Sequence, residues 1–349
     1  MKNSKWTNRQ KFQRYLIADV GVNHENSMDK AKLMISQIKD AGWDCVKFQI
    51  YTADTIAQKD SPSYWDTTKE EARSQYELFS KYDKFTVENY IELYEYSNHV
   101  GIDFCGTIFN ESLIHYFDAL IPFYKIASAD LTNLLLIECI LKTGKDIILS
   151  TGASDYTEIA NTIDFILKNK QKSSKVILLH CVLNYPTLYE HADLSKIYFL
   201  RDKFSDIEIG YSDHVPPDDG LLCLVTAYAA GAKVIEKHFT YDKSLKGNDH
   251  YHSYDYNDAL SLKNKLEKID ILNGNDEKDV RLNQSQARQY ARRSIVAKKD
   301  IHVGDKLTIE NLTALRPFNG ISPIKWPAIK GKFAKKTILK DSLLTEGDY

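Results

Sequence analysis

The chain has 349 residues, of which 43% are hydrophobic and 27% are charged, a composition typical of a globular protein with one large and one small domain. Its formal net charge of −2 and its pI near 6.6 leave no basic excess for binding nucleic acid or an anionic membrane surface. No apolar signal-peptide core follows the polar N-terminal segment, and no apolar run approaches the roughly 18 residues of a membrane span. We therefore expect a cytoplasmic protein without nucleic-acid or membrane partners.

Five cysteines are scattered along the chain without Cys-x-x-Cys spacing: Cys45, Cys105, Cys139, Cys181 and Cys223. Four of them lie in apolar runs. This pattern favours small buried side chains in a reducing compartment over a disulfide framework or a zinc cluster.

From residue 16 onward, short apolar runs alternate with amphipathic segments, the pattern of repeated strand–helix units. Eight such units have the length and rhythm of a (β/α)8 (TIM) barrel, so we predict an α/β fold of this class. A doubly wound open sheet is the alternative, but no Gly-x-Gly-x-x-Gly follows the first strand and eight units are many for one sheet. The predicted strands span residues 16–21, 45–49, 103–107, 123–126, 146–150, 176–181, 207–211 and 233–238, and helices are predicted at 87–99, 111–119, 133–142, 156–170 and 220–231.

Polar side chains stand at the ends of these strands, where a barrel of this class carries its active site. Lys47 and Lys125 end otherwise apolar strands, and lysine is seldom buried without a partner. Two ammonium groups at one mouth, with hydroxyls nearby, predict a site for a phosphorylated or carboxylated anion. The other strand-end residues are Asp19, Asn23, His24, Gln49, Thr107, Ser128, Ser150, Thr151 and Tyr185.

Two histidines close the last two predicted strands, His214 in Ser-Asp-His and His238 in Glu-Lys-His-Phe. The strand–helix–strand pattern between them makes the two strands parallel neighbours, so both imidazoles reach the same edge of the sheet. Neutral imidazole suits divalent transition ions, which makes the pair a candidate metal site. A pair of hydrogen-bonded histidines at the rim is the structural alternative.

Residues 52–82 interrupt the strand–helix rhythm with a long polar and Tyr-rich stretch that starts at the predicted active mouth. Loops of this length in compact domains are usually functional, often as lids. A surface excursion with its own short helix, at residues 69–79, explains the stretch equally well.

The pattern changes again near the C-terminus. We assign residues 1–270 to the barrel, 271–290 to a polar linker and 291–349 to a small, mostly β domain. In that domain we expect short strands at 293–297 and 335–340 and a short helix at 309–314. Arg316 lies in a turn where its guanidinium could reach a neighbouring site as a bidentate donor.

Seven motifs of the chain resemble those of the sialic acid synthases, which condense phosphoenolpyruvate to make N-acetylneuraminate and related nonulosonates such as legionaminate and pseudaminate. Residues 292–317 resemble the antifreeze-like (SAF) domain that ends the same enzymes. The likeness runs in the family's order from residue 16 to the C-terminus. The motifs are VNHENS (22–27), VKFQ (46–49), YKIASAD (124–130), ILSTGAS (148–154), LLHC with YPT (178–187), IGYSDH (209–214) and VIEKHF (234–239).

The resemblance implies a reaction and a metal. Phosphoenolpyruvate would condense through C3 with the aldehyde of an open-chain N-acylated hexosamine, typically N-acetylmannosamine. Water would then add to C2, and phosphate would leave by C–O cleavage. A divalent cation on His214 and His238, Mn²⁺ first and Mg²⁺ or Co²⁺ next, would polarise the aldehyde oxygen and orient the sugar.

The resemblance also implies roles for individual residues. Arg316 would come from the other subunit, because family dimers place each small domain over the partner's barrel, and so we expect a domain-swapped homodimer. Catalytic roles go to Asp19, Lys47, Lys125 and Asp130. The phosphoenolpyruvate site carries over to Lys47, Thr107, Lys125, Ser128, Ser150 and Ser212, and the sugar site to Asp19, Gln49, Tyr185, Asp249 and Arg316.

Several positions depart from the family's pattern. Asp19 replaces a common Glu, one methylene longer, and Asp130 stands where Glu is also common. Leu183 occupies a position that commonly holds Asn or Ser at the phosphoenolpyruvate. The adjacent Asn184 is assigned to substrate binding, and its substitution for that residue stays open. Residues 246–250 replace a more Pro-rich version. Most departures fall on the sugar side, so the identity of the sugar stays open.

Three alternatives to an N-acetylneuraminate synthase remain. The first is a legionaminate- or pseudaminate-type synthase that uses a diacetamido-trideoxyhexose, which differs in its contacts at C4 and C6. The second is a non-catalytic sugar-binding barrel. The third is a magnesium-dependent barrel hydrolase, which would need more carboxylates at the strand ends than this mouth supplies.

Overall fold

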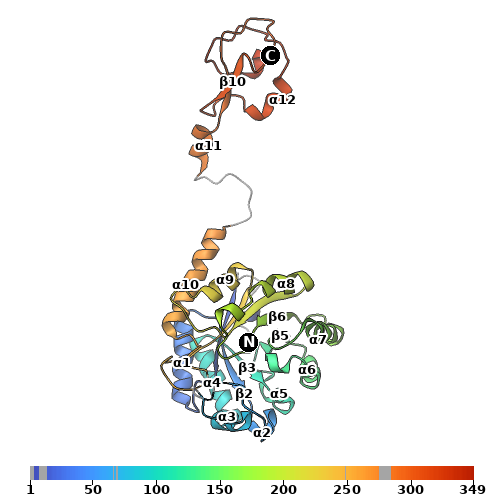
Figure 1. Ribbon diagram of the computed structural model, residues 1–349, viewed down its shortest axis with the longest axis vertical. Helices are drawn as coiled ribbons and strands as arrows, with labels where there is room; N and C mark the ends of the chain where they lie inside the picture. Colours follow the sequence, from blue (N-terminus) through green and yellow to red (C-terminus); the bar gives the residue numbers. More distant parts are fainter. Residues whose placement is uncertain (1–3, 8–13, 66, 68–69, 248, 275–283) are drawn as a thin grey trace. The chain divides into compact units, whose positions relative to one another are not determined.

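The computed structural model describes residues 4–7, 14–65, 67, 70–247, 249–274 and 284–349. The chain divides into two compact units, Met1–Gly274 and Asn275–Tyr349 (Figure 1). Among the described residues, no helix combines the length and the apolar character needed to cross a membrane.

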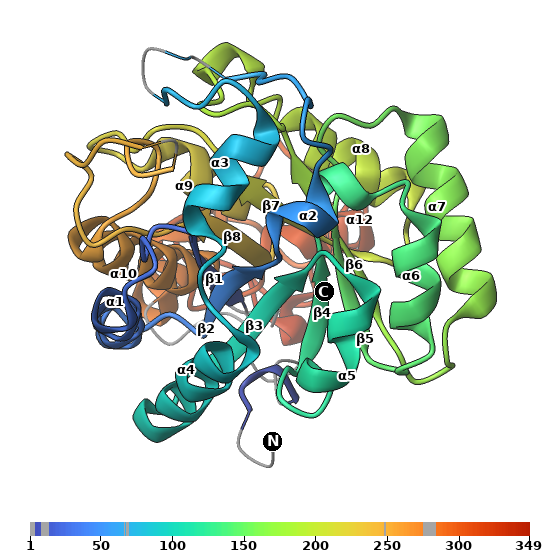
Figure 2. The same cartoon turned by 90° about the horizontal axis from the view of Figure 1, so that it is seen from below.

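The first unit is a closed barrel of eight parallel strands, which neighbour one another in sequence order. Viewed end-on, the strands form the centre of the unit and the helices surround them (Figure 2). The prediction of a (β/α)8 barrel is confirmed, and each predicted strand matches an observed one. The strands are β1 (Tyr15–Gly21), β2 (Cys45–Ile50), β3 (Asp103–Ile108), β4 (Phe123–Ile126), β5 (Asp146–Ser150), β6 (Val176–Cys181), β7 (Glu208–Asp213) and β8 (Val234–His238).

The helices of the barrel begin at polar caps and bury their apolar face against the strands. The hydroxyl of Ser27 accepts from the amide of Lys30 at the start of α1, and Asp155 closes a capping box at the start of α7. The predicted helix 111–119 begins as a 3₁₀ turn, Glu111–Leu113, before α5. The helices are α1 (Met28–Asp40), α4 (Val87–Val100), α5 (Ile114–Phe117), α6 (Leu134–Leu141), α7 (Tyr156–Asn169), α8 (Ser195–Lys203), α9 (Leu222–Ala229) and α10 (Tyr256–Asn273).

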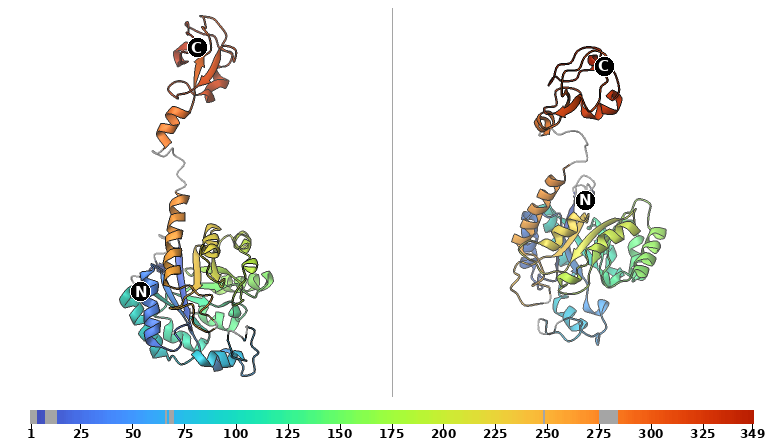
Figure 3. Two further views of the ribbon diagram at one scale, coloured as in Figure 1. Left: turned by 60° about the vertical axis from the view of Figure 1, so that its left-hand side comes forward. Right: turned by 45° about the horizontal axis from the view of Figure 1, so that its top comes forward.

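The long segment after β2 folds into two further helices, α2 (Ala53–Ile56) and α3 (Gln75–Tyr82). Both lie at one end of the barrel (light blue in Figure 3). The short helix predicted at residues 69–79 is therefore observed further along the chain, because Ser74, whose side chain accepts from the amide of Glu77, sets its start.

Strand side chains alternate between the helix layer and the barrel interior, and this two-residue period places the polar groups. On β1, Leu16 and Ala18 pack outward among the helices, while Tyr15 and Ile17 face the interior. Asp19 continues the inward series and reaches the mouth. The same sequence of apolar then polar inward residues recurs in Cys45 and Lys47, Cys105 and Thr107, Phe123 and Lys125, Ile148 and Ser150, and Val234 and Glu236.

Trp6 packs into the inward apolar cluster from the N-terminal segment of the chain. Its indole lies 4.3 Å from the ring of Phe123 and donates from Nε1 to Asp146 Oδ2 at 2.9 Å. Apolar side chains therefore fill the interior below the polar layer, which leaves the C-terminal ends of the strands as the open mouth.

The second unit is small and built around two antiparallel strands, β9 (Ser294–Ala297) and β10 (Leu312–Leu315), with helices α11 (Ser285–Ala291) and α12 (Trp326–Ile329). Its own apolar core includes Ile295, Leu312 and Ile338. The predicted strand at 335–340 contributes a single bridge, between Ile301 and Ile338.

The short helix predicted at 309–314 is wrong, because this stretch enters β10. Asn311 Oδ1 accepts from the amide of Thr308 at 2.9 Å, and this turn delivers Leu312 to the strand. The predicted linker, 271–290, is helical at both ends, in α10 and α11, and residues 275–283 lie outside the described part of the chain.

Candidate active site

Most of the predicted site residues line one cavity of about 280 Å³ at the C-terminal mouth of the barrel. Asp249 lines a second cavity, which adjoins the first because Gln49, Tyr185 and His238 border both. The predicted residues on the wall of the larger cavity are Asp19, Lys47, Gln49, Thr107, Lys125, Ser128, Asp130, Ser150, Tyr185, Ser212, His214 and His238.

Lys47 lies at the centre of the mouth with 2% of its surface exposed. Its ammonium contacts Asp19 Oδ2 at 2.7 Å on the neighbouring strand and donates to Thr107 Oγ1 at 3.1 Å. Burial alone would lower the pKa of Lys47, but Asp19 and Glu236 outweigh it and hold the pKa above its ordinary value. Lys47 is therefore a fixed positive charge.

Lys125 supplies a second buried ammonium, 3% exposed, from the adjacent part of the barrel. It donates to Ser150 Oγ at 2.8 Å and to the carbonyl oxygen of Ile126 at 3.0 Å. Glu236 Oε1 lies 3.6 Å from this ammonium and accepts from Ser212 Oγ at 2.8 Å. The two lysines thus share one buried carboxylate, since Glu236 also approaches Lys47 at 3.9 Å.

Three hydroxyls around the lysines each accept a hydrogen bond from a neighbouring N–H group. Thr107 and Ser150 accept from the ammonium groups, and Ser128 Oγ accepts from the amide of Gly152 at 2.9 Å. A hydroxyl that accepts in this way still carries one O–H donor. Two cations and three hydroxyls converge on the cavity, an arrangement suited to an oxygen-rich anion.

The two histidines border the same cavity as the lysines. The rings of His214 and His238 lie 5.3 Å apart, and the ring of Tyr185 packs 4.3 Å from His214. His214 Nδ1 bonds to the carbonyl oxygen of Val182 at 2.7 Å. This bond fixes the orientation of the ring and does not involve the other ring nitrogen, Nε2.

His238 is buried between two carboxylates. Its Nε2 lies 3.7 Å from Asp19 Oδ2, and its Nδ1 lies 3.7 Å from Asp249 Oδ2. Burial, together with the positive charges of His214 and Lys47, holds the pKa of His238 well below its ordinary value. Burial and the nearby Asp19 raise the pKa of Asp249 to about 7. His238 is therefore a neutral imidazole that lies beside a carboxyl group poised to ionise.

The smaller cavity, about 90 Å³, has a largely aromatic wall. Its polar members include Asn23, Gln49 and Asp249. The long segment after β2 supplies a further group of lining residues: Tyr64, Trp65, Leu78, Phe79 and Tyr82. This segment is thus part of the mouth rather than a remote excursion.

Three predicted site residues differ in their placement: Asn184, Asp130 and Arg316. Asn184 is exposed and is not among the lining residues of either cavity, whereas Leu183 lines the larger one. Asp130 lies half-buried on the wall, and its Oδ1 accepts from Asn133 Nδ2 at 3.0 Å. Burial raises the pKa of Asp130. Arg316 follows β10 in the second unit and is exposed there.

Two residues of the site were missed by sequence reasoning. Glu236 is one, although the period of β8 places it on the same inward face as His238, and this signal could have found it. His252 is the other. It belongs to an irregular segment after β8, where no periodicity indicates the direction of a side chain.

The fold and this mouth define a class of protein: a (β/α)8 enzyme whose active site pairs an anion-binding half with a half rich in imidazole and carboxylate. The NeuB family model matches residues 34–278, and the SAF domain model matches residues 292–349. The chain belongs to the NeuB family and carries a C-terminal SAF domain.

Named relatives cover nearly the whole chain. It is 34% identical to N,N'-diacetyllegionaminic acid synthase of Campylobacter jejuni (95% of this chain, 98% of that one) and 32% identical to pseudaminic acid synthase of Helicobacter pylori (95% and 97%). Among solved structures it resembles N-acetylneuraminic acid (sialic acid) synthetase of Leptospira borgpetersenii, with a TM-score of 0.69, 29% identity and coverage of 79% and 90%. The predicted family and the prediction of a synthase-like enzyme are confirmed.

Proposed function

We propose that this chain condenses phosphoenolpyruvate with an open-chain N-acylated hexosamine to give a nine-carbon sialic-type acid and inorganic phosphate. C3 of phosphoenolpyruvate forms the new C–C bond with the aldehyde carbon, and the aldehyde oxygen gains a proton to become a hydroxyl. Water adds to C2, and the C–O bond to phosphate then breaks. The observation that carries the proposal is the convergence of two buried lysines and three hydroxyls on one cavity beside an imidazole cluster.

Lys47, Lys125 and the hydroxyls of Thr107, Ser128 and Ser150 would bind the phosphate and carboxylate of phosphoenolpyruvate. In a buried site such charge-assisted contacts are strong, and they need little rearrangement when the substrate enters. Asp19, Glu236 and Ser212 would hold the ammonium groups in position until the anion arrives.

A divalent cation fits the other half of the mouth, because imidazole and carboxylate donors gather there. His238 Nδ1 is buried and has no hydrogen-bond partner among the described residues, as expected of a group that awaits a ligand. His214 and His238 would hold the cation, with Mn²⁺ the first choice. When bound, it would supply Lewis-acid polarisation of the aldehyde oxygen. Asp19 and Asp130 would hold or move protons at the reacting hydroxyls.

N-acetylmannosamine is the first acceptor sugar to consider, in line with the Leptospira relative named for N-acetylneuraminic acid. One observation favours a diacetamido-trideoxyhexose as the second candidate. The aromatic wall beside Gln49 and Asp249 suits a methyl group better than a hydroxymethyl group, and the relatives at 34% and 32% identity are named for legionaminic and pseudaminic acids.

A homodimer in which each SAF domain serves its partner's barrel is part of the proposal. Arg316 would reach the sugar from the other subunit as a bidentate donor. Its exposure in the second unit fits this role, since the guanidinium is not engaged in the core of its own domain.

Phosphate release tests the proposed function. Purified protein with phosphoenolpyruvate and Mn²⁺ would be assayed against N-acetylmannosamine and 2,4-diacetamido-trideoxyhexoses, with and without a chelator. We expect release with one sugar only, abolished by chelator and restored by metal. No release with any of these sugars, by protein that still binds phosphoenolpyruvate, would contradict the proposed acceptors.

A further inference from the structure

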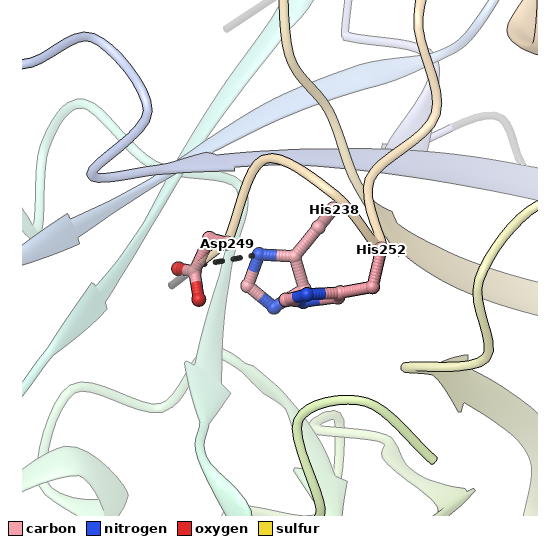
Figure 4. Close-up of side chains that lie close together, drawn as sticks. All are labelled: His238, Asp249 and His252. Carbon is pink, nitrogen blue, oxygen red and sulfur yellow. Dashed lines mark ion pairs between the residues drawn. The ribbon is translucent and has the colours of Figure 1, made fainter. Parts of the chain in front are cut away.

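Three side chains with metal-ligand chemistry meet at the end of β8: His238 from the strand, and Asp249 and His252 from the segment that follows (Figure 4). Their potential ligand atoms all lie within 4.8 Å of one another. His238 and His252 are 5% and 0% exposed, so the group is enclosed by protein rather than presented to solvent.

The spacing within this group is close to that of ligands sharing one ion. His238 Nδ1 and Asp249 Oδ2 are 3.7 Å apart, and two donors at about 2.1 Å from one ion lie about 3.0–3.4 Å apart. The rings of His238 and His252 lie 5.1 Å apart, where two imidazoles on one ion have centroids about 4.5–5.2 Å apart. The side chains would need to move only slightly closer together to coordinate one ion.

The backbone after β8 holds the three residues together. The amide of Tyr254 donates to the carbonyl oxygen of His238 at 2.8 Å, and the amide of Thr240 donates to that of Tyr254 at 2.9 Å. These bonds close the intervening segment against the strand end. Asn23 Nδ2 donates to Ser253 Oγ at 3.1 Å and so ties the segment to the region after β1.

We propose that His252, together with His238 and Asp249, is a direct ligand of the divalent cation of this enzyme. The inference rests on the proposed function in one respect, since the cation is the one that the condensation would use. His214 lies further out, with its ring 6.1 Å from that of His252, and its Nδ1 is committed to Val182. His214 would join through its remaining nitrogen.

Three imidazoles and one carboxylate still leave positions of a six-coordinate ion open for water and for a sugar oxygen. The donor set has a consequence for metal choice. Imidazole-rich sites favour transition ions such as Mn²⁺, Co²⁺, Fe²⁺ and Zn²⁺ over Mg²⁺, which prefers oxygen ligands and keeps its waters. We expect Co²⁺ and Mn²⁺ to bind much more tightly than Mg²⁺.

Metal binding to the chelator-stripped, full-length protein, measured by calorimetry with Co²⁺ and Mn²⁺ and without substrates, tests the inference. His252→Gln should weaken Co²⁺ binding by about 100-fold or more, because a ligand counts for at least as much as its supporting partners. His252→Asp, which restores a ligand atom, should recover part of the affinity. His180→Gln is the matched control, since His180 is a buried histidine bonded to the carbonyl oxygen of Ala192, and it should bind Co²⁺ like the wild type.

Co²⁺ affinity in His252→Gln equal to that of the wild type would overturn the inference, as would a wild type that binds neither ion. If His252→Gln fails to fold, anomalous diffraction from Co²⁺-soaked wild-type crystals decides. An ion about 2.0–2.2 Å from a nitrogen of His252 supports the inference, and an ion more than about 4 Å away overturns it. Tight binding that depends on His252, without phosphate release from any sugar, would contradict the proposed function and leave this inference standing.

Discussion

Glu236 lies between the two lysines of the mouth, with Oε1 3.6 Å from Lys125 Nζ and Oε2 3.9 Å from Lys47 Nζ. Oε2 is buried and makes no hydrogen bond within the described part of the chain. A buried carboxylate that shares two ammonium groups stabilises them before substrate binds, and it competes with the anionic substrate for the same charges.

Replacing Glu236 by Gln should therefore lower the stability of the free protein and strengthen its binding of phosphoenolpyruvate. The variant keeps an acceptor for Ser212 but removes the charge shared by the two lysines, and Asp19 stays paired with Lys47. We expect a loss of about 3 kcal/mol in the free energy of unfolding of the free protein. We also expect a larger thermal shift on adding phosphoenolpyruvate than in the wild type. Thermal unfolding with and without phosphoenolpyruvate measures both, and weaker binding of phosphoenolpyruvate would contradict this role for Glu236.

Lys125→Met should remove phosphoenolpyruvate binding and leave metal binding intact. The buried ammonium contributes a charge-assisted contact, and its loss should weaken phosphoenolpyruvate by about 100-fold or more. Calorimetric titration with phosphoenolpyruvate, followed by Co²⁺ in a separate run, reports the two halves of the mouth independently. Lys142→Met, a substitution at the exposed position that follows α6, is the control, because its ammonium pairs with Glu138 on the surface. Equal losses of both ligands would indicate misfolding rather than a role at the anion site.

The alternation of side chains along the strands explains how much of this site could be predicted from sequence. Once Lys47 and Lys125 were placed at strand ends, the barrel made them neighbours, since all eight C-terminal ends meet at one mouth. The same period predicts that Lys237, between Glu236 and His238, faces away from the mouth. It does so, and it forms a fully buried ion pair with Asp213 at 2.6 Å.

Other parts could not be predicted, because they depend on irregular backbone. His252 reaches His238 only through the hydrogen bonds that close the segment after β8, and no spacing rule applies to such a segment. The prediction of a helix at 309–314 was wrong for a related reason. The side chain of Asn311 offered the backbone a turn in place of a helix, and a turn of this kind is a local choice that the hydrophobic pattern does not reveal.

His24 should make the protein sensitive to acid. Its ring is buried and stacked 4.2 Å from Phe85, and burial lowers its pKa to about 4. In the unfolded chain the pKa returns to about 6.5, so the unfolded state gains a proton first as the pH falls. The contribution of neutral His24 to the free energy of unfolding is thus fully present above pH 6.5. It falls by about 3 kcal/mol as the pH drops from 6.5 to about 4.

Urea unfolding at intervals from pH 8 to pH 4.5 tests this dependence, with His24→Asn as the comparison. Asn keeps an acceptor for the amide of Asn26, which His24 Nδ1 accepts at 3.1 Å, but it does not titrate. We expect the variant to be less stable at pH 8, because it loses the stacking on Phe85, and to lose less stability than the wild type on acidification. Parallel pH profiles for the two proteins would show that other groups cause the acid sensitivity.

Complementation between two inactive variants tests the predicted exchange of SAF domains. Arg316→Ala would remove the sugar contact and His238→Ala the metal ligand, so each homodimer should be inactive. If each site combines the barrel of one subunit with Arg316 of the other, a mixed dimer has one site with both residues intact. Random mixing makes half of the dimers mixed, and activity should recover to about a quarter of the wild-type value. The measurement is phosphate release after the two variants are unfolded and refolded together, with each variant refolded alone as the control. No recovery in a preparation shown to contain mixed dimers would place Arg316 with its own barrel, because a site built within one subunit cannot be repaired by a partner.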